Sequence, residues 1–139
     1  MNKHLVFVYG TLRRGGERPM SARFPDSKFI ADAKVNGSLY DLGAYPGLFL
    51  NESNSSVIGE VYEVGDELLN ELDDFEASTR YLRKEVEISL GSHSRSGWVY
   101  VPDTEFYSPR TLITSGDWME YARTKTDWPE DTIPDEAQR

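Results

Sequence analysis

One amphipathic segment stands among many short strand-like segments, and this contrast limits the fold more than any other feature. In residues 66–76, a rotation of about 100° per residue places four large apolar side chains on one stripe. These side chains are Leu68, Leu69, Leu72 and Phe75. The opposite side carries polar residues, namely Glu67, Asn70, Asp73 and Asp74. The spacing therefore predicts a helix that packs one apolar face against a core.

The segments before and after this helix are rich in β-branched and aromatic residues and are bounded by turn-forming residues. We expect strands near residues 5–9, 29–36, 38–42, 57–64, 81–90 and 98–101. A short helical turn is expected near residues 20–24, a turn at residues 45–47, and a C-terminal helix through residues 118–121, capped by Ser115 or Asp117. This order predicts an α+β fold with mainly antiparallel strands, whose sheet can curl into a barrel.

The length and composition predict one folded domain. The chain has 139 residues, of which 38% are hydrophobic and 12% aromatic, so a hydrophobic core is expected. The residues from 125 onward are polar and acidic and include Pro129 and Pro134. We therefore expect a domain at residues 1–124 and a flexible acidic tail at residues 125–139.

One acidic residue lies on the apolar side of the predicted helix. Glu76 lies roughly 80° from Leu68, between Leu72 and Leu69, inside the apolar arc. A carboxylate that faces a core is costly unless it is paired or neutralised, and its pKa should rise. Such a carboxyl group can transfer protons near neutral pH. The alternative is that the helix ends at Phe75, in which case the angular position of Glu76 has no meaning.

Charge and residue usage exclude several classes of function. The net charge of −9 argues against partnership with nucleic acid or with an anionic membrane surface. The absence of cysteine excludes disulfides, thiolate nucleophiles and cysteine-ligated zinc. His4 and His93 are the only histidines and lie far apart, so no histidine-based metal site is expected. The sequence has no signal-peptide or membrane-span pattern, and we expect a cytoplasmic protein.

The first strand is followed by a loop that is rich in glycine and arginine. It begins Tyr9-Gly10-Thr11-Leu12-Arg13 and continues through Arg14 and Arg18. A strand that stops at glycine can leave consecutive backbone N–H groups to bind a carboxylate or another small anion. The alternative is an ordinary strand-to-loop turn with solvated arginines. Residues 37–47, Tyr81 and Arg83 are further candidates for lining a pocket, although each also suits a plain structural role.

Four segments in this order form a specific pattern. They are residues 9–13, the Gly-x-Leu-Tyr-x-Leu-Gly-x-Tyr-Pro run at 37–46, Gly-Glu-Val-Tyr at 59–62, and Leu-Asp-x-x-Glu with Tyr-x-Arg at 72–83. The set resembles the γ-glutamylcyclotransferase-like proteins, which include γ-glutamylamine cyclotransferases and plant avirulence-induced-like proteins. Residues 113–118 are similar to the closing segment of many bacterial members. The resemblance runs from about residue 6 to residue 121.

The resemblance implies a small mixed barrel with flanking helices, and neither a metal nor an organic cofactor. By position, it implies substrate binding by the loop residues and by a tyrosine that follows the catalytic acid, namely Tyr9, Gly10, Thr11, Leu12 and Tyr81. Glu76 takes the place of the family's catalytic acid/base. The sequence departs from the family at Ala77, because many members have glycine after the glutamate.

The activity that the resemblance implies is acyl transfer within a small γ-glutamyl amine or peptide. The α-amine attacks the γ-carbonyl, 5-oxoproline forms, and the amine leaves. An intramolecular attack needs positioning more than a strong nucleophile, and one carboxylate can carry the protons. The alternative is a non-catalytic module that binds a small acidic ligand on the same fold. The sequence specifies neither the leaving amine nor an oligomeric state.

Overall fold

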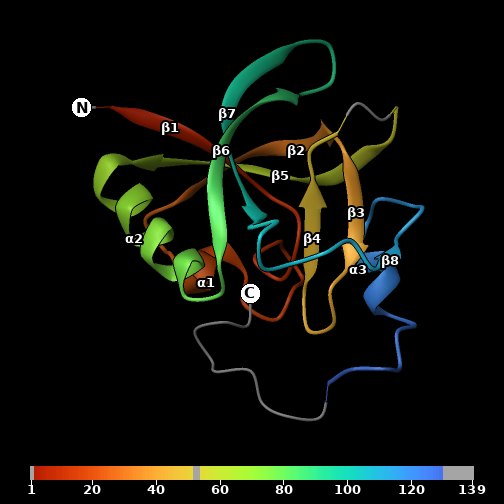
Figure 1. The fold of residues 1–139 in the computed structure, drawn as a ribbon. Helices are drawn as coiled ribbons and strands as arrows, with labels where there is room; N and C mark the ends of the chain where they lie inside the picture. The colour runs from red at the N-terminus through yellow and green to blue at the C-terminus, as the bar shows by residue number, and fades with distance from the viewer. Residues whose placement is uncertain (1, 52–53, 130–139) are drawn as a thin grey trace.

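The computed structural model describes residues 2–51 and 54–129. Five strands close into a barrel in the order β1-β5-β2-β6-β7 (Figure 1). Their bounds are β1 Lys3–Val8, β2 Lys28–Asn36, β5 Ser56–Gly65, β6 Tyr81–Ser89 and β7 Ser94–Pro102. The β1 and β7 strands run parallel, and the other neighbouring pairs are antiparallel. The barrel is thus mixed and mostly antiparallel, which confirms the predicted fold class.

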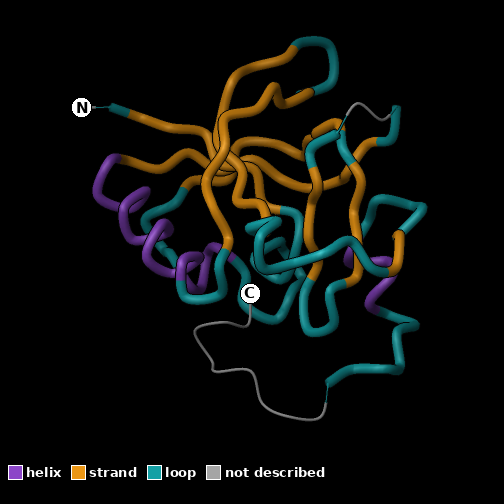
Figure 2. The backbone as a smooth tube through the Cα atoms, in the orientation of Figure 1, coloured by secondary structure: helices purple, strands orange, loops and turns teal. Residues whose placement is uncertain are grey.

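A smaller three-stranded sheet lies beside the barrel, and three helices complete the fold of the described residues (Figure 2). The strands of this sheet are β3 Ser38–Asp41, β4 Pro46–Phe49 and β8 Thr111–Leu112, and the helices are α1 Met20–Arg23, α2 Asp66–Ala77 and α3 Trp118–Ala122. Two expectations were wrong here. Pro46 and Gly47 belong to β4 rather than to a turn, and the short strand β8 was not expected. Both strands depend on pairing with β3, which the local sequence does not reveal.

The first strand is buried on both faces. Leu5 and Phe7 belong to a core that includes the interior of the barrel. Val6 and Val8 alternate with them and belong to a second core, which also contains the apolar residues of α2. This double burial explains why β1 is a continuous apolar run rather than an alternating one. Its C-terminal end consequently lies between the two cores.

The α2 helix packs along one side of the barrel (Figure 1) and includes Glu76 in its last turn. The glutamate is 4% exposed, like the apolar residues of the same stripe. The helix stops at Ala77, and Arg80 then adopts a left-handed conformation with φ of 66°. The prediction that the helix extends through Glu76 is therefore confirmed, and the alternative that it ends at Phe75 was wrong.

The C-terminal part of the described chain packs against the smaller sheet. Asp117 caps α3 by accepting a hydrogen bond from the Glu120 amide at 3.3 Å, as one of the two proposed caps. Lys125, expected to begin a flexible tail, instead has a side chain only 1% exposed and bonds to Asp41. This contact joins the start of the segment expected to be a tail to the smaller sheet. The rest of the predicted tail, residues 130–139, lies outside the described residues. None of the described helices has the length and apolarity needed to cross a membrane.

The turn before α3 is fixed by a close approach of two backbones. Gly116 has φ of 71°, and its carbonyl accepts a hydrogen bond from the Ile58 amide of β5 at 2.8 Å. A Cβ atom at this position would lie 2.1 Å from the Ser56 carbonyl oxygen. Gly91 also has a positive φ, of 91°, yet a Cβ there would meet nothing within 4 Å.

We predict that Gly116→Ala destabilises the protein much more than Gly91→Ala. Both substitutions carry the left-handed backbone cost of about 1–2 kcal/mol, whereas only Gly116→Ala adds a clash with backbone atoms. The free energy of unfolding in urea should fall by about 1 kcal/mol for Gly91→Ala and by about 3 kcal/mol or more for Gly116→Ala. Equal losses would contradict this account of the turn.

Candidate active site

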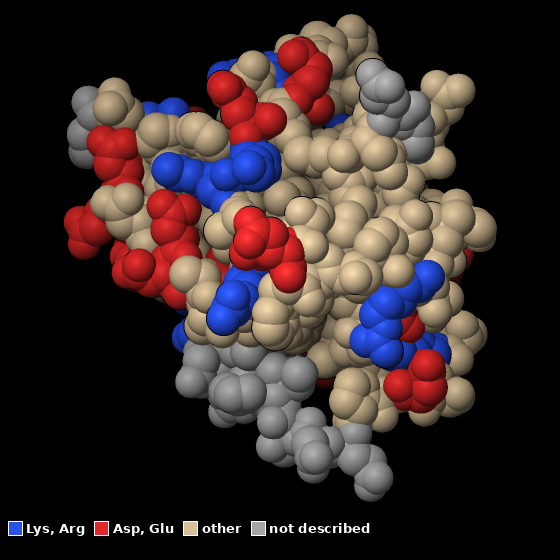
Figure 3. All heavy atoms as spheres, in the orientation of Figure 1, with Lys and Arg blue, Asp and Glu red and all other residues tan. Residues whose placement is uncertain are grey.

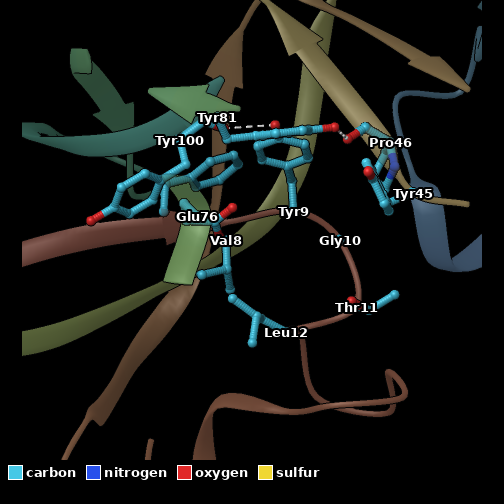
Figure 4. Close-up of a pocket in the computed structure, with 11 residues that line it drawn as sticks. Val8, Tyr9, Gly10, Thr11, Leu12, Tyr45, Pro46, Glu76, Tyr81 and Tyr100 are labelled. Atoms are coloured by element: carbon cyan, nitrogen blue, oxygen red, sulfur yellow. Dashed lines mark hydrogen bonds between the residues drawn. The ribbon is translucent and has the colours of Figure 1, made fainter. Parts of the chain in front are cut away.

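A pocket lies where the end of β1, the last turn of α2, the start of β6 and the loop before β4 meet (Figure 4). It encloses about 40 Å³, which suits a few water molecules or the polar end of a small ligand. Its lining residues are Phe7, Val8, Tyr9, Gly10, Thr11, Leu12, Tyr45, Pro46, Glu76, Tyr81 and Tyr100. All six residues singled out from the sequence are among them, brought together from three separate parts of the chain.

The Tyr9 ring is held in place by both sheets. Its hydroxyl donates to the Tyr100 carbonyl of β7 at 2.7 Å and accepts from the Leu48 amide of β4 at 3.2 Å. Tyr81 makes a parallel connection, because its hydroxyl donates to the Pro46 carbonyl at 2.7 Å. These buried hydrogen bonds fix the rings that form the floor and wall of the pocket.

The loop after β1 presents backbone amides that the described part of the protein does not use. The Arg13 amide donates to the Gly10 carbonyl at 3.0 Å, but the three amides before it, of Gly10, Thr11 and Leu12, donate to no described residue. The Thr11 hydroxyl is also buried without a hydrogen-bond partner among these residues. Figure 4 shows the main chain of this loop curving around the pocket, across from the Glu76 side chain. Consecutive amides in this arrangement suit a small anion.

A close contact favours glycine at the start of this loop. A Cβ atom on Gly10 would lie 3.1 Å from the Cγ atom of Pro46, which stands on the opposite wall. A larger residue at position 10 would therefore narrow the pocket or push Pro46 away. The contact explains why a small residue follows β1 at this point next to the proline.

Glu76 lines the pocket from a buried position at the C-terminal end of α2. The side chain is 4% exposed and lies in the last turn of α2, where the helix dipole opposes negative charge. The α2 helix has no basic residue in its last turn. Acidic side chains also gather over the outer side of this helix (Figure 3). The carboxyl group thus lines the same pocket as the loop after β1.

Tyr100 lines the pocket and contacts a second acid of the helix that carries Glu76. Its hydroxyl donates to Asp73 at 2.7 Å. Desolvation, followed by the hydrogen bond and the charge of Asp73, raises the pKa of Tyr100 above its ordinary value, and the charge of Glu76 adds to this effect. The phenol consequently remains a neutral donor. Arg83 also contacts Asp73, with 3.5 Å between Nε and the carboxylate.

An aromatic cluster supports the wall of the pocket opposite β1. The rings of Tyr45 and Tyr81 pack edge-on at 5.8 Å, and Tyr107 packs against Tyr81 at 5.6 Å. The Tyr107 hydroxyl lies 3.2 Å from that of Tyr45 and donates to the Thr79 carbonyl at 2.8 Å. Because Thr79 follows α2 directly, Tyr107 links this wall to the end of the helix that carries Glu76.

The arginines of the loop do not line the pocket. Arg13 is held between Glu60, at 3.5 Å, and Asp117, at 2.9 Å. The Arg14 guanidinium contacts Asp32 at 2.6 Å, and its backbone amide donates to Glu60 at 3.0 Å. Glu60 is 2% exposed and also accepts from the Tyr62 hydroxyl at 3.0 Å. The buried carboxylate thus anchors the loop from the side away from the pocket.

Most, but not all, of the residues that line this pocket are predicted from the sequence. Tyr45 and Pro46 line the pocket as members of the predicted 37–47 segment, whereas Arg83 stacks over Trp98 at 4.3 Å outside it. Tyr100 was missed because a strand aromatic looks like any core residue. Within the described ranges, no group of three histidine, cysteine, aspartate or glutamate side chains is arranged to hold a metal ion.

Comparison with known proteins gives consistent family matches. The model of the family described as γ-glutamyl cyclotransferase, AIG2-like, matches residues 6–120. A Vibrio cholerae protein that carries the provisional name γ-glutamylcyclotransferase is 40% identical over 119 residues, covering 85% of this chain and 97% of its own. The γ-L-glutamyl-butirosin B γ-glutamyl cyclotransferase of Niallia circulans is 36% identical over 124 residues, covering 84% of this chain and 76% of its own.

A solved structure shows the same fold. YkqA of Bacillus subtilis superposes with a TM-score of 0.73 at 28% identity, over 89% of this chain. The chain spans only 44% of the length of YkqA, so the likeness concerns one part of that protein.

We predict that Glu60→Gln lowers stability more than Asp32→Asn, although both acids contact Arg14. The first change weakens a hydrogen-bonded carboxylate that is buried, which costs about 1–3 kcal/mol. The second removes an ion pair in which Asp32 is 75% exposed, worth no more than about 1 kcal/mol. Urea unfolding of the two variants measures the difference. An equal effect would show that Glu60 does not anchor the loop.

Proposed function

We propose, because the chain belongs to the γ-glutamyl cyclotransferase, AIG2-like family, that it releases 5-oxoproline from a small γ-glutamyl amine or peptide. One observation carries this proposal. A desolvated carboxyl group, that of Glu76, shares a pocket with the amide-lined loop at Gly10, Thr11 and Leu12. The activity named for the Niallia circulans relative supports the reaction class.

In this proposal the loop holds the substrate's α-carboxylate. The amides of Gly10, Thr11 and Leu12 supply donors without a cationic side chain, since Arg13 and Arg14 are engaged with acids elsewhere. Tyr9 and Tyr81 provide rigid aromatic faces for the aliphatic part of the glutamyl group. Holding the α-amine near its own γ-carbonyl lowers the activation free energy of the attack by up to about 7–11 kcal/mol, because the entropy of bringing the two groups together is lost on binding.

In this proposal Glu76 then acts as the general base and general acid of the reaction. Its carboxylate accepts a proton from the α-ammonium group, and the free amine attacks the γ-carbonyl carbon. The new C–N bond closes the five-membered ring, and the bond to the leaving nitrogen breaks. The carboxylic acid returns its proton to that nitrogen, then accepts the second proton, which the attacking nitrogen loses as the lactam forms, and passes it to the released amine. The products are 5-oxoproline and the ammonium form of the amine, and no water is consumed. Burial suits both steps, because it brings the neutral and charged forms of the carboxyl closer in free energy.

We predict that Glu76→Gln lowers kcat for 5-oxoproline release by about 10²- to 10⁴-fold. The amide fills the same volume but neither accepts nor returns a proton. The measurement is product release across a panel of γ-glutamyl amines and peptides. Glu67→Gln, an exposed change on the same helix, is the matched control and should retain wild-type activity.

A folded Glu76→Gln variant with full activity would overturn the assignment of this residue. The alternative function, a binding module for a small acidic ligand, gives a different pattern. In that case L-glutamate or 5-oxoproline would raise the melting temperature of the wild-type protein, and no member of the panel would release product.

A further inference from the structure

A buried ion pair lies outside the pocket and has no part in the proposed chemistry. Asp41, at the end of β3, is 6% exposed, and the Lys125 side chain that meets it is 1% exposed. The Lys125 Nζ atom lies 2.8 Å from Asp41 Oδ2, and the Tyr121 hydroxyl donates to the same oxygen at 2.7 Å. Lys125 comes after the segment matched by the family model, which ends at residue 120.

The second oxygen of Asp41 fixes the turn that leads into the pocket. Oδ1 accepts a hydrogen bond from the Gly43 amide at 2.8 Å. The turn is closed by the Leu42 amide, which donates to the Tyr45 carbonyl at 3.2 Å. Because both oxygens of one carboxylate are engaged, the position of Lys125 and the shape of this turn are coupled.

Two residues at the end of this turn, Tyr45 and Pro46, line the pocket. Tyr45 packs against Tyr81, and the Pro46 carbonyl accepts the Tyr81 hydroxyl. Pro46 also approaches Gly10 of the amide-lined loop. A displacement of the turn would therefore change the distance between the two walls of the pocket.

The chain after Lys125 reinforces the contact. The Trp128 indole N–H donates to the Lys125 carbonyl at 3.0 Å, and its ring packs edge-on against Trp118 at 5.8 Å. Although desolvation lowers the pKa of Lys125, hydrogen bonds to Asp127 and Asp41 outweigh it and raise this pKa above its ordinary value. The ammonium group is thus charged throughout the physiological pH range.

We infer that Lys125, supported by Trp128, forms a clamp that holds the turn after Asp41, and with it Tyr45 and Pro46, in the geometry that binds substrate. Lys125 is a positioning residue in this inference, since it touches no pocket atom and acts through Asp41. The kinetic part of the inference rests on the proposed function. Its structural part, the rigidity of residues 42–46, is independent of any activity.

The test begins with Lys125→Met, which keeps an unbranched side chain and removes the charge. The variant leaves the buried Asp41 carboxylate without its cation, so the turn should loosen. We expect KM for the γ-glutamyl substrate to rise on the order of tenfold with kcat changed less than about twofold, because Glu76 is untouched. Hydrogen exchange measured by mass spectrometry on the full chain should accelerate in peptides that contain residues 42–46.

The double variant Asp41→Asn/Lys125→Met separates charge pairing from general damage. It removes both charges, so no unpaired buried ion remains and KM should return to within about threefold of the wild type. Asp127→Asn is the matched control, because Asp127 bonds to the same ammonium at 2.8 Å but is 82% exposed. This variant should leave KM and exchange unchanged.

Wild-type values of KM and exchange in Lys125→Met would overturn the inference, as would a double variant no better than the single one. If Lys125→Met does not fold, Tyr121→Phe decides, since it removes a neutral donor to Asp41. A KM rise of about threefold then supports the clamp, and an unchanged KM overturns it. If the wild-type protein releases no 5-oxoproline, the proposed function fails and the exchange results alone decide the inference.

Discussion

The double burial of β1 is the constraint on which the site depends. Leu5 and Phe7 belong to the core that includes the barrel interior, and Val6 and Val8 belong to the core that contains α2, so the strand must run between two cores. After the strand stops at Val8, the chain emerges beside the last turn of α2. Glu76 and the loop amides therefore share a pocket because of how the cores are divided, and not because of any direct attraction between them.

The charged side chains near the pocket are mostly paired with one another outside it. The protein is strongly acidic, and the arginines nearest the loop form ion pairs with Glu60, Asp117 and Asp32 instead of facing the pocket. An anionic ligand group would consequently meet neutral amide dipoles at this loop rather than the guanidinium groups of Arg13 and Arg14.

The features predicted from the sequence are those that local patterns encode. The phase of Glu76 on its helix and the glycine after a buried strand each depend on a few neighbouring residues. The features that were missed depend on contacts between distant segments: Tyr100 reaches the pocket through barrel closure, and Lys125 finds Asp41 84 positions away. A polar C-terminal segment is predicted to be a tail, because its own composition does not show that its lysine contacts a buried carboxylate.

Two buried acids, Glu60 and Asp41, hold the two loops that form opposite walls of the pocket. Buried ion pairs often contribute little net stability, because desolvation offsets their attraction, and apolar replacements are frequently as stable. Stability alone therefore does not explain why charged groups occupy both places. Directional hydrogen bonds fix a turn in a way that apolar packing does not, and each carboxylate binds a backbone amide of its loop, that of Arg14 or of Gly43. We therefore interpret the ion pairs of Glu60 and Asp41 as contacts that fix the two loops and, through them, the distance between the pocket walls.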